Sequence, residues 1–194
     1  MNEDELYTRY EDVEKEISMY NKSIWKDKVI YCNCDNPGDD GKGNYSQLAT
    51  YFLQKFNELG LKKLICTYYS APMDLFNQGV NGYVFTKKGY RELSGFSGSF
   101  DDPLSLKMLN EEADIVCTNP PFSRMKDYWN IIIKSGKKFL IISDLTNVKN
   151  QPYMTYFKAN KVWAGYNRID YFLSPKKELV EASGHWFTNI PITP

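Results

Sequence analysis

The run Ala113-Asp114-Ile115-Val116-Cys117-Thr118 leads directly into Asn119-Pro120-Pro121-Phe122. Its apolar part is short and continuous, which is typical of a strand buried on both faces of a parallel sheet. In open α/β sheets, ligands bind beyond the carboxyl ends of such strands. We therefore expect the four residues 119–122 to form a functional loop at one edge of a sheet.

The residue types of this loop suit the methylation of a planar, amide-like nitrogen. The lone pair of an exocyclic amino group is delocalised, so a site helps by accepting its N–H groups as the nitrogen becomes tetrahedral. Asn119 offers a side-chain carbonyl and Pro120 a backbone carbonyl. Pro120 and Pro121 keep the loop extended, and Phe122 offers a ring face to a flipped base. An ordinary strand-ending turn is the alternative, because Asn and Pro are common in turns.

Strand-like and helix-like patterns alternate along the rest of the chain. Helices are expected over residues 3–24, 46–59, 104–112, 126–134 and 153–159. Strands are expected over residues 28–34, 63–69, 80–86, 89–93, 114–118, 138–143, 161–165 and 185–189. The alternation predicts an α/β fold with a Rossmann-like, mostly parallel sheet flanked by helices. Ser46 is expected to cap the second helix, and Gly60 to end it.

The length and charge of the chain limit its class. At 194 residues it is long enough for one domain with a sizeable core. We expect an N-terminal helical segment, residues 1–27, packed on a catalytic domain of residues 28–194. The formal net charge is zero, which argues against a protein that coats nucleic acid by charge alone, although a local basic groove remains compatible with it.

Cysteine usage and the N-terminus indicate a cytoplasmic protein without a metal. The acidic start of the chain is no signal peptide, and no stretch is apolar enough to span a membrane. The four cysteines, Cys32, Cys34, Cys66 and Cys117, lie in strand-like runs. A Cys-x-Cys pair on alternate faces of a strand is poor metal geometry, so we expect reduced core thiols and no metal site. The single histidine, His185, is expected to be a packed strand residue rather than a general base.

The first strand and the loop after it are expected to bind a methyl donor, S-adenosylmethionine. Asp35 and Asn36 stand at the carboxyl end of that strand, and Gly41 and Gly43 permit close approach of the backbone. The helix that opens at Ser46 presents free N–H groups suited to a carboxylate. The glycines do not form Gly-x-Gly-x-x-Gly, so an ordinary surface loop explains the segment about equally well.

Residues 98–102 are a second candidate contact for the cofactor, near its adenine; a turn followed by a helix cap is the equal alternative. Asp144 and Asn147, after the strand at 138–143, are secondary pocket candidates. The full set of candidate cofactor residues is Cys34, Asp35, Asn36, Asn44, Ser99, Phe100 and Asp101.

The run Tyr31-Cys32-Asn33-Cys34-Asp35-Asn36-Pro37 and the block at residues 113–123 resemble the EcoRI-type family of adenine-specific DNA methyltransferases. That family has a similar Cys-x-Cys-Asp-Asp-Pro run. Further similar blocks lie at residues 59–65, 138–142, 160–166 and 186–189. The resemblance therefore spans most of residues 28–189.

The resemblance implies transfer of a methyl group from S-adenosylmethionine to N6 of adenine in a short site of double-stranded DNA. It implies base flipping, with Asn119 and Pro120 gripping the amino group and Phe122 stacking on the base. It also implies that Cys34, Asp35 and residues 99–101 lie near the cofactor, and that the protein belongs to bacterial or phage restriction-modification.

Two departures from the family pattern concern the cofactor side. Ser99 stands where the family tends to carry an acid, and a glycine-rich insertion follows Pro37. Family members also carry a target-recognition segment beyond the block at 186–189. Either the chain is a truncated or minimal enzyme, or an additional domain or subunit reads the DNA.

Two alternative functions stay open at this point. The same kind of loop serves enzymes that methylate RNA or protein glutamine, because all of these substrates present a planar, amide-like nitrogen. The other alternative is a catalytically degenerate module that binds nucleic acid or cofactor without turnover.

Overall fold

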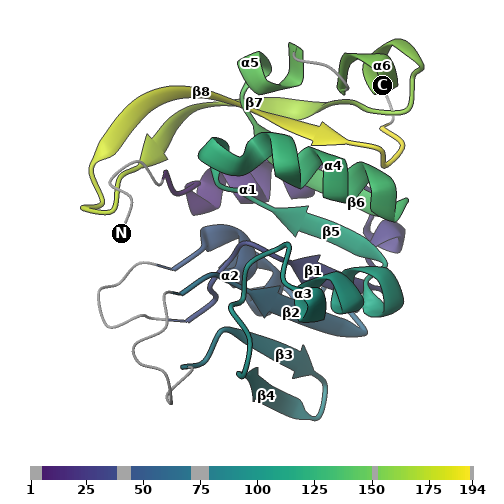
Figure 1. The fold of residues 1–194 in the computed structure, drawn as a ribbon, viewed down its shortest axis with the longest axis vertical. Coiled ribbons are helices and arrows are strands. Elements are labelled where there is room, and N and C mark those ends of the chain that lie inside the picture. Colours follow the sequence, from purple (N-terminus) through teal and green to yellow (C-terminus); the bar gives the residue numbers. More distant parts are fainter. Residues whose placement is uncertain (1–5, 39–44, 71–78, 150–152, 193–194) are drawn as a thin grey trace.

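The computed structural model describes residues 6–38, 45–70, 79–149 and 153–192. They form one eight-stranded sheet with helices on both faces, in the strand order β4-β3-β2-β1-β5-β6-β8-β7 (Figure 1). The strands are β1 (Val29–Cys32), β2 (Lys63–Thr67), β3 (Gly82–Thr86), β4 (Gly89–Leu93), β5 (Ile115–Thr118), β6 (Lys138–Ser143), β7 (Trp163–Leu173) and β8 (Leu179–Thr188).

The helices are mostly short and separate the strands along the chain. They are α1 (Tyr10–Ile17), the 3-10 helix η1 (Lys22–Ile24), α2 (Gln47–Gln54), α3 (Pro103–Lys107), the π-helix η2 (Met108–Glu112), the 3-10 helix η3 (Phe122–Arg124), α4 (Met125–Ser135), α5 (Leu145–Lys149) and α6 (Tyr153–Lys158). Within the described residues, no helix has the length and apolar character needed to cross a bilayer.

The middle of the sheet is parallel and its edges are antiparallel. Strands β2, β1, β5 and β6 run in parallel, and β1 and β5 are buried along their whole length. The hairpin β3–β4 continues the sheet at one edge, and the hairpin β8–β7 at the other. The predicted α/β fold is confirmed, and the sheet is mixed because each edge ends in a hairpin.

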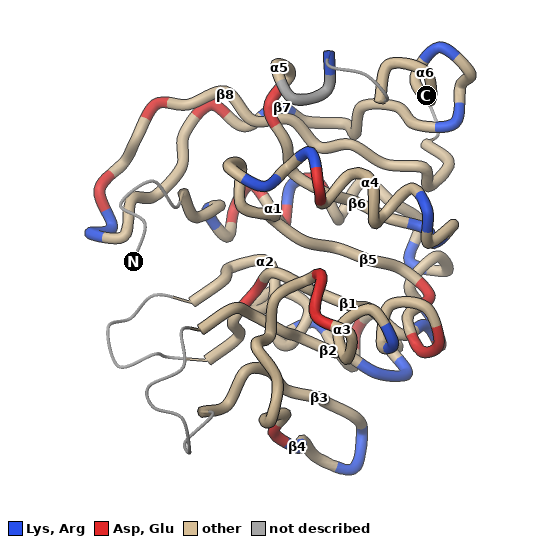
Figure 2. Tube along the Cα trace, viewed as in Figure 1, with Lys and Arg blue, Asp and Glu red and all other residues tan. Residues whose placement is uncertain are grey.

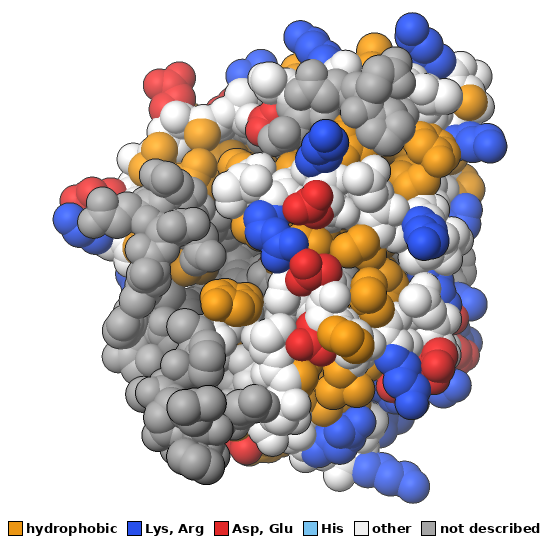
Figure 3. All heavy atoms as spheres, in the orientation of Figure 1, with side chains coloured by type: hydrophobic (Ala, Val, Ile, Leu, Met, Phe, Trp, Pro, Cys, Tyr) orange, Lys and Arg blue, Asp and Glu red, His pale blue; other side chains and the backbone are white. Residues whose placement is uncertain are grey.

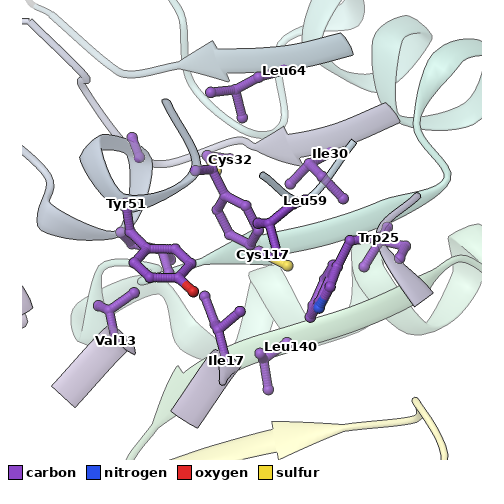
Figure 4. Close-up of a cluster of buried hydrophobic side chains, with 14 of the residues drawn as sticks. Val13, Ile17, Trp25, Ile30, Cys32, Tyr51, Leu59, Leu64, Cys117 and Leu140 are labelled. Atoms are coloured by element: carbon purple, nitrogen blue, oxygen red, sulfur yellow. The ribbon is translucent and has the colours of Figure 1, made fainter. Parts of the chain in front are cut away.

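Two apolar layers cover the two faces of the sheet. On one face, Val13 and Ile17 of α1 and Tyr51 of α2 point toward strand residues such as Cys32 and Leu140 (Figure 4). On the other face, side chains of α4 pack with Phe100 and with strand residues of the opposite orientation. Successive side chains of a strand point to opposite faces, which explains why the central strands carry consecutive apolar residues, such as residues 64–66 and 139–142.

Most predicted elements are present, with two kinds of difference. The strands expected at 161–165 and 185–189 are far longer, as β7 and β8, and the prediction of their lengths was wrong. In the described part of the helix expected over 3–24, the structure has two helices, α1 and η1. The Asn21 side chain accepts the Ser23 N–H at 2.9 Å and starts the second of them. The helix expected to run to residue 59 ends at Gln54 and continues as turns to Gly60, whose φ is +66°.

A buried carboxylate joins α1 to the hairpin β7–β8. Glu16 is fully buried and accepts the backbone N–H groups of Tyr166 (2.9 Å) and Asn167 (2.8 Å) at an irregularity in the pairing of β7 with β8. The Tyr20 hydroxyl and the Asn167 side-chain amide also donate to it. A bulge leaves ladder N–H groups unpaired, and Glu16 satisfies them from the neighbouring helix.

Gly165 lies beside this carboxylate and has no room for a side chain. A Cβ atom there would lie 2.2 Å from Glu16 Oε1 and 2.7 Å from Trp186 Cβ. We expect Gly165→Ala to lower the free energy of unfolding by about 1–3 kcal/mol, because a close-packed site must shift to accept the methyl group. Urea denaturation measures this change. Gly79→Ala is the matched control, since no atom of the described residues lies within 4 Å of its added Cβ. Equal stabilities for the two variants would contradict the packing described here.

Candidate active site

The carboxyl end of β1 is the topological switch point of the sheet. After β1 the chain passes to β2 on one side, and it later returns to β5 on the other side. Ligand crevices of open α/β sheets lie at such points. The loop after β1 is joined to both neighbours: the Cys34 N–H donates to Thr118 Oγ1 (3.1 Å), and the Asp35 N–H donates to the Thr67 carbonyl (3.0 Å).

Asp35 lies at the centre of this junction with only 2% of its surface exposed. One carboxylate oxygen accepts the Ser46 hydroxyl at 2.6 Å, and the other accepts the Thr118 hydroxyl. The nearby backbone N–H groups of Cys34 and Asn119 also act to lower the pKa of this carboxyl. A single side chain thus joins the loop after β1, the first turn of α2 and Thr118, which directly precedes the loop 119–122. Both of its oxygens are engaged within the protein, and a direct contact of Asp35 with a cofactor stays a prediction.

Burial also sets the protonation of this junction. It raises the pKa of Asp35 to about 6, while hydrogen bonds from Ser46 and Thr118 act in the opposite direction. Burial raises the pKa of the Cys34 thiol well above its usual value, and the nearby Asp35 carboxylate raises it further. Cys34 is therefore a neutral thiol at physiological pH.

The predicted loop 119–122 follows β5 directly, at the same edge as residues 33–36. Asn119 is partly buried, and its Nδ2 donates to the backbone carbonyl of Leu6 at 3.0 Å. Its Oδ1 is buried and has no hydrogen-bond partner among the described residues. An unpaired buried acceptor is rare in folded proteins and calls for an explanation. Pro120 is buried, and Pro121 directly precedes η3.

Phe122 begins η3 and lies at the meeting point of the two apolar layers. Its ring stands edge-on to that of Phe172, with ring centres 6.1 Å apart and planes at 87°. The contact fixes the ring at the end of the loop 119–122. Its role as a stacking platform for a base stays a prediction.

Arg124 of η3, directly after the loop 119–122, contacts the turn at residues 99–101; the sequence alone did not single out this residue. Arg124 Nη2 lies 2.6 Å from the Asp101 carboxylate, and Nη1 lies 3.2 Å from the Ser99 hydroxyl. The guanidinium carbon also sits 4.5 Å from the centre of the Phe100 ring. The hydrogen bonds from Arg124 and Ser99 lower the pKa of Asp101. The presence of an arginine two residues after Phe122 was the available signal.

The remaining sequence candidates are less informative. Asn44, Gly41 and Gly43 lie outside the described residues. Asp144 follows β6 at the edge that carries the loop, and Asn147 lies in α5. His185 pairs with Ser143 across β8 and β6, and burial lowers its pKa. In the described ranges, no group of three His, Cys, Asp or Glu side chains is placed to hold a metal ion.

Two hollows of the surface lie away from the loop. One, of about 220 Å³, lies between α4 and α6, where Figure 3 shows exposed hydrophobic side chains. The other, of about 260 Å³, lies between α2 and the hairpin β3–β4. Neither is lined by residues 33–36 or 119–122. Figure 2 shows acidic and basic positions interspersed over several elements, with no continuous basic strip in that view of the described chain.

The pKa of Asp35 predicts a pH-dependent stability. The pKa of about 6 in the folded protein lies above the ordinary value of 3.8, so the contribution of Asp35 to stability is largest below about pH 4 and is lost as the pH rises through 6. Asp35→Asn has no such titration. We expect the free energy of unfolding of the wild type, relative to Asp35→Asn, to fall by on the order of 2 kcal/mol between pH 4.5 and 7.5. Urea denaturation across this range checks it, and a pH-independent difference would contradict it.

Comparison with known proteins places the chain in a family. A family model described as "Adenine-specific methyltransferase EcoRI" matches residues 1–189. Type II methyltransferase M.EcoRI from Escherichia coli is 37% identical over 176 residues, covering 84% of this chain and 52% of that protein. Type II methyltransferase M.MpnI from Mycoplasma pneumoniae is 33% identical over 163 residues, covering 84% of this chain and 47% of that protein. The chain thus spans about half the length of the curated relatives it matches.

A solved structure shares the fold. The crystal structure of PH1948 from Pyrococcus horikoshii, named as a candidate RNA methyltransferase, matches with a TM-score of 0.50 and 15% sequence identity. The match covers 97% of this chain and 89% of that chain, and at this identity it concerns the fold alone. With the family model matching nearly the whole chain, this protein belongs to the EcoRI family of adenine-specific methyltransferases.

Proposed function

We propose that this protein transfers a methyl group from S-adenosylmethionine to N6 of adenine in double-stranded DNA. The observation that carries the proposal is the Asn119 side chain, whose Nδ2 is engaged while Oδ1 is buried and unpaired. A donor brought to Oδ1 would satisfy a polar group that is costly to leave unpaired. The amino group of a flipped adenine is such a donor, and family membership supports this substrate.

The chemistry required of the protein is modest. S-adenosylmethionine supplies, when bound, a methyl group attached to a positively charged sulfur. The lone pair of the adenine amino nitrogen forms the new bond to that carbon as the carbon–sulfur bond breaks. Asn119 Oδ1 and the Pro120 carbonyl accept the two N–H groups as the nitrogen becomes tetrahedral and positive. One proton is then lost to water, so no side chain is needed as a base.

The residues at the switch point suit the cofactor. Cys34 and Asn36 flank the buried Asp35 in the loop after β1, and the Asn36 side chain accepts the Gly38 N–H at 2.9 Å. The Ser99 hydroxyl and the Asp101 carboxylate, fixed by Arg124, are acceptors suited to an adenine amino group. We propose that these residues, with Asn44, hold S-adenosylmethionine.

The proposal extends to partners and setting. The chain spans about half the length of its relatives, and Figure 2 shows basic and acidic positions interspersed along the described chain in that view. We therefore propose that a further domain or subunit takes part in reading the DNA sequence. The protein would act on DNA in the cytoplasm, in restriction-modification.

Removal of the Asn119 amide tests the proposed function. We expect Asn119→Ala to lower the rate of labelled-methyl transfer to unmethylated duplex DNA by about 100-fold, because one preorganised acceptor is lost. The dissociation constant of S-adenosylmethionine, measured by calorimetric titration, is expected to change less than about twofold. Asn130→Ala, at an exposed position on α4, is the matched control. Label that enters RNA or protein but not DNA would overturn the substrate, and an undiminished rate would overturn the role of Asn119.

A further inference from the structure

The segment before α1 reaches across the sheet edge to the catalytic loop. Tyr7 and Leu173, the last residue of β7, form an isolated antiparallel bridge in which each N–H donates to the other carbonyl at 2.8 Å. The neighbouring carbonyl of Leu6 accepts the Asn119 Nδ2 at 3.0 Å. A segment 113 positions away in sequence thus contacts the one side chain on which the proposed chemistry depends.

An asparagine side chain has two nearly isosteric orientations, related by exchange of its oxygen and nitrogen. Only one of them is useful at position 119. With Oδ1 toward the adenine amino group, an acceptor faces a donor. In the reverse orientation, Asn119 Nδ2 would face the amino group, and both are donors. A backbone carbonyl can only accept, so it selects the orientation in which Nδ2 points toward Leu6 and Oδ1 points away.

We infer that residues 6–9 act as a positioning strap, and that the Leu6 carbonyl fixes the Asn119 amide so that Oδ1 is the acceptor for the nitrogen being methylated. The inference rests on the proposed function and adds a positioning group to it. Leu6 acts through Asn119 and is not itself catalytic.

The strap is held at Leu6 and at the residues that follow it. The Leu6 side chain packs against the apolar layer that contains α1 and α2. Thr8 is 3% exposed, and the Arg9 guanidinium pairs with Asp12 (2.7 Å) and Glu11 (2.9 Å) at the start of α1. These contacts fix the strap to α1 and to the end of β7, so the orientation of the amide depends on elements outside the catalytic loop.

Weakening the bridge between Tyr7 and Leu173 in the 194-residue chain tests the inference. Tyr7→Pro removes the N–H that donates to Leu173. We expect a single-turnover rate of methyl transfer to unmethylated duplex DNA at least about tenfold lower, with calorimetric affinity for S-adenosylmethionine changed less than about twofold. Lys176→Pro is the matched control, because it removes an exposed N–H in the turn of the same hairpin. A Tyr7→Pro rate equal to that of Lys176→Pro would overturn the inference.

The same substitution in an Asn119→Asp background separates orientation from a general structural effect. Both oxygens of aspartate are acceptors, so an orienting group has nothing left to select. We expect Tyr7→Pro to cost less than about twofold in that background. An equal fold loss in both backgrounds would show that the strap supports the fold and does not orient the amide.

Hydrogen exchange in the unmodified chain gives an answer that does not depend on activity. In protein labelled with ¹⁵N-asparagine, the Asn119 side-chain pair is the one lost in Asn119→Asp. We expect its hydrogens to exchange at least about tenfold more slowly than those of the exposed Asn130, because Leu6 holds them. Exchange as fast as that of Asn130 would overturn the contact. Absence of methyl transfer by the wild type would overturn the proposed function. The exchange measurement would still show whether the Leu6 carbonyl holds the Asn119 amide.

Discussion

The hydrogen bonds of the buried Asp35 carboxylate hold together the parts of the molecule on which a reaction would depend. Ser46 and Thr118 donate to it from two different elements, and its own backbone N–H pairs with the end of β2. Desolvating a carboxylate is unfavourable unless donors surround it, and here the donors come from the segments that must be aligned. The free-energy cost of burying this charge therefore depends on the relative positions of these loops. A shift of one loop weakens hydrogen bonds that also align the others.

The central sheet was predictable because its local and global signals agree. The strand expected over 138–143 is β6, the hairpin 80–93 forms with its turn after Thr86, and the helix expected over 126–134 is α4 with one more residue at each end. Continuous apolar runs ended by Gly, Asn or Pro need no tertiary information to be recognised. The lengths of β7 and β8 were not predictable in the same way, since few of their outer residues are buried and their pairing depends on each other.

The loop at 119–122 was recognisable from its residue types, whereas its surroundings were not. Nothing local to Asp35 distinguishes a carboxylate that faces a ligand from one that faces Ser46 and Thr118. The contact between Leu6 and Asn119 involves a backbone carbonyl, which carries no signature in the sequence. Such roles depend on which distant segments the topology brings together, so no local sequence pattern predicts them.

The raised pKa of the Cys34 thiol has a consequence for a protein proposed to handle a methyl sulfonium. A thiolate is a strong nucleophile and would compete with the substrate for the methyl group, whereas a neutral thiol reacts far more slowly. Burial and the nearby Asp35 keep Cys34 in its protonated form. The same carboxylate that aligns the loops therefore also protects the protein from alkylating its own sulfur.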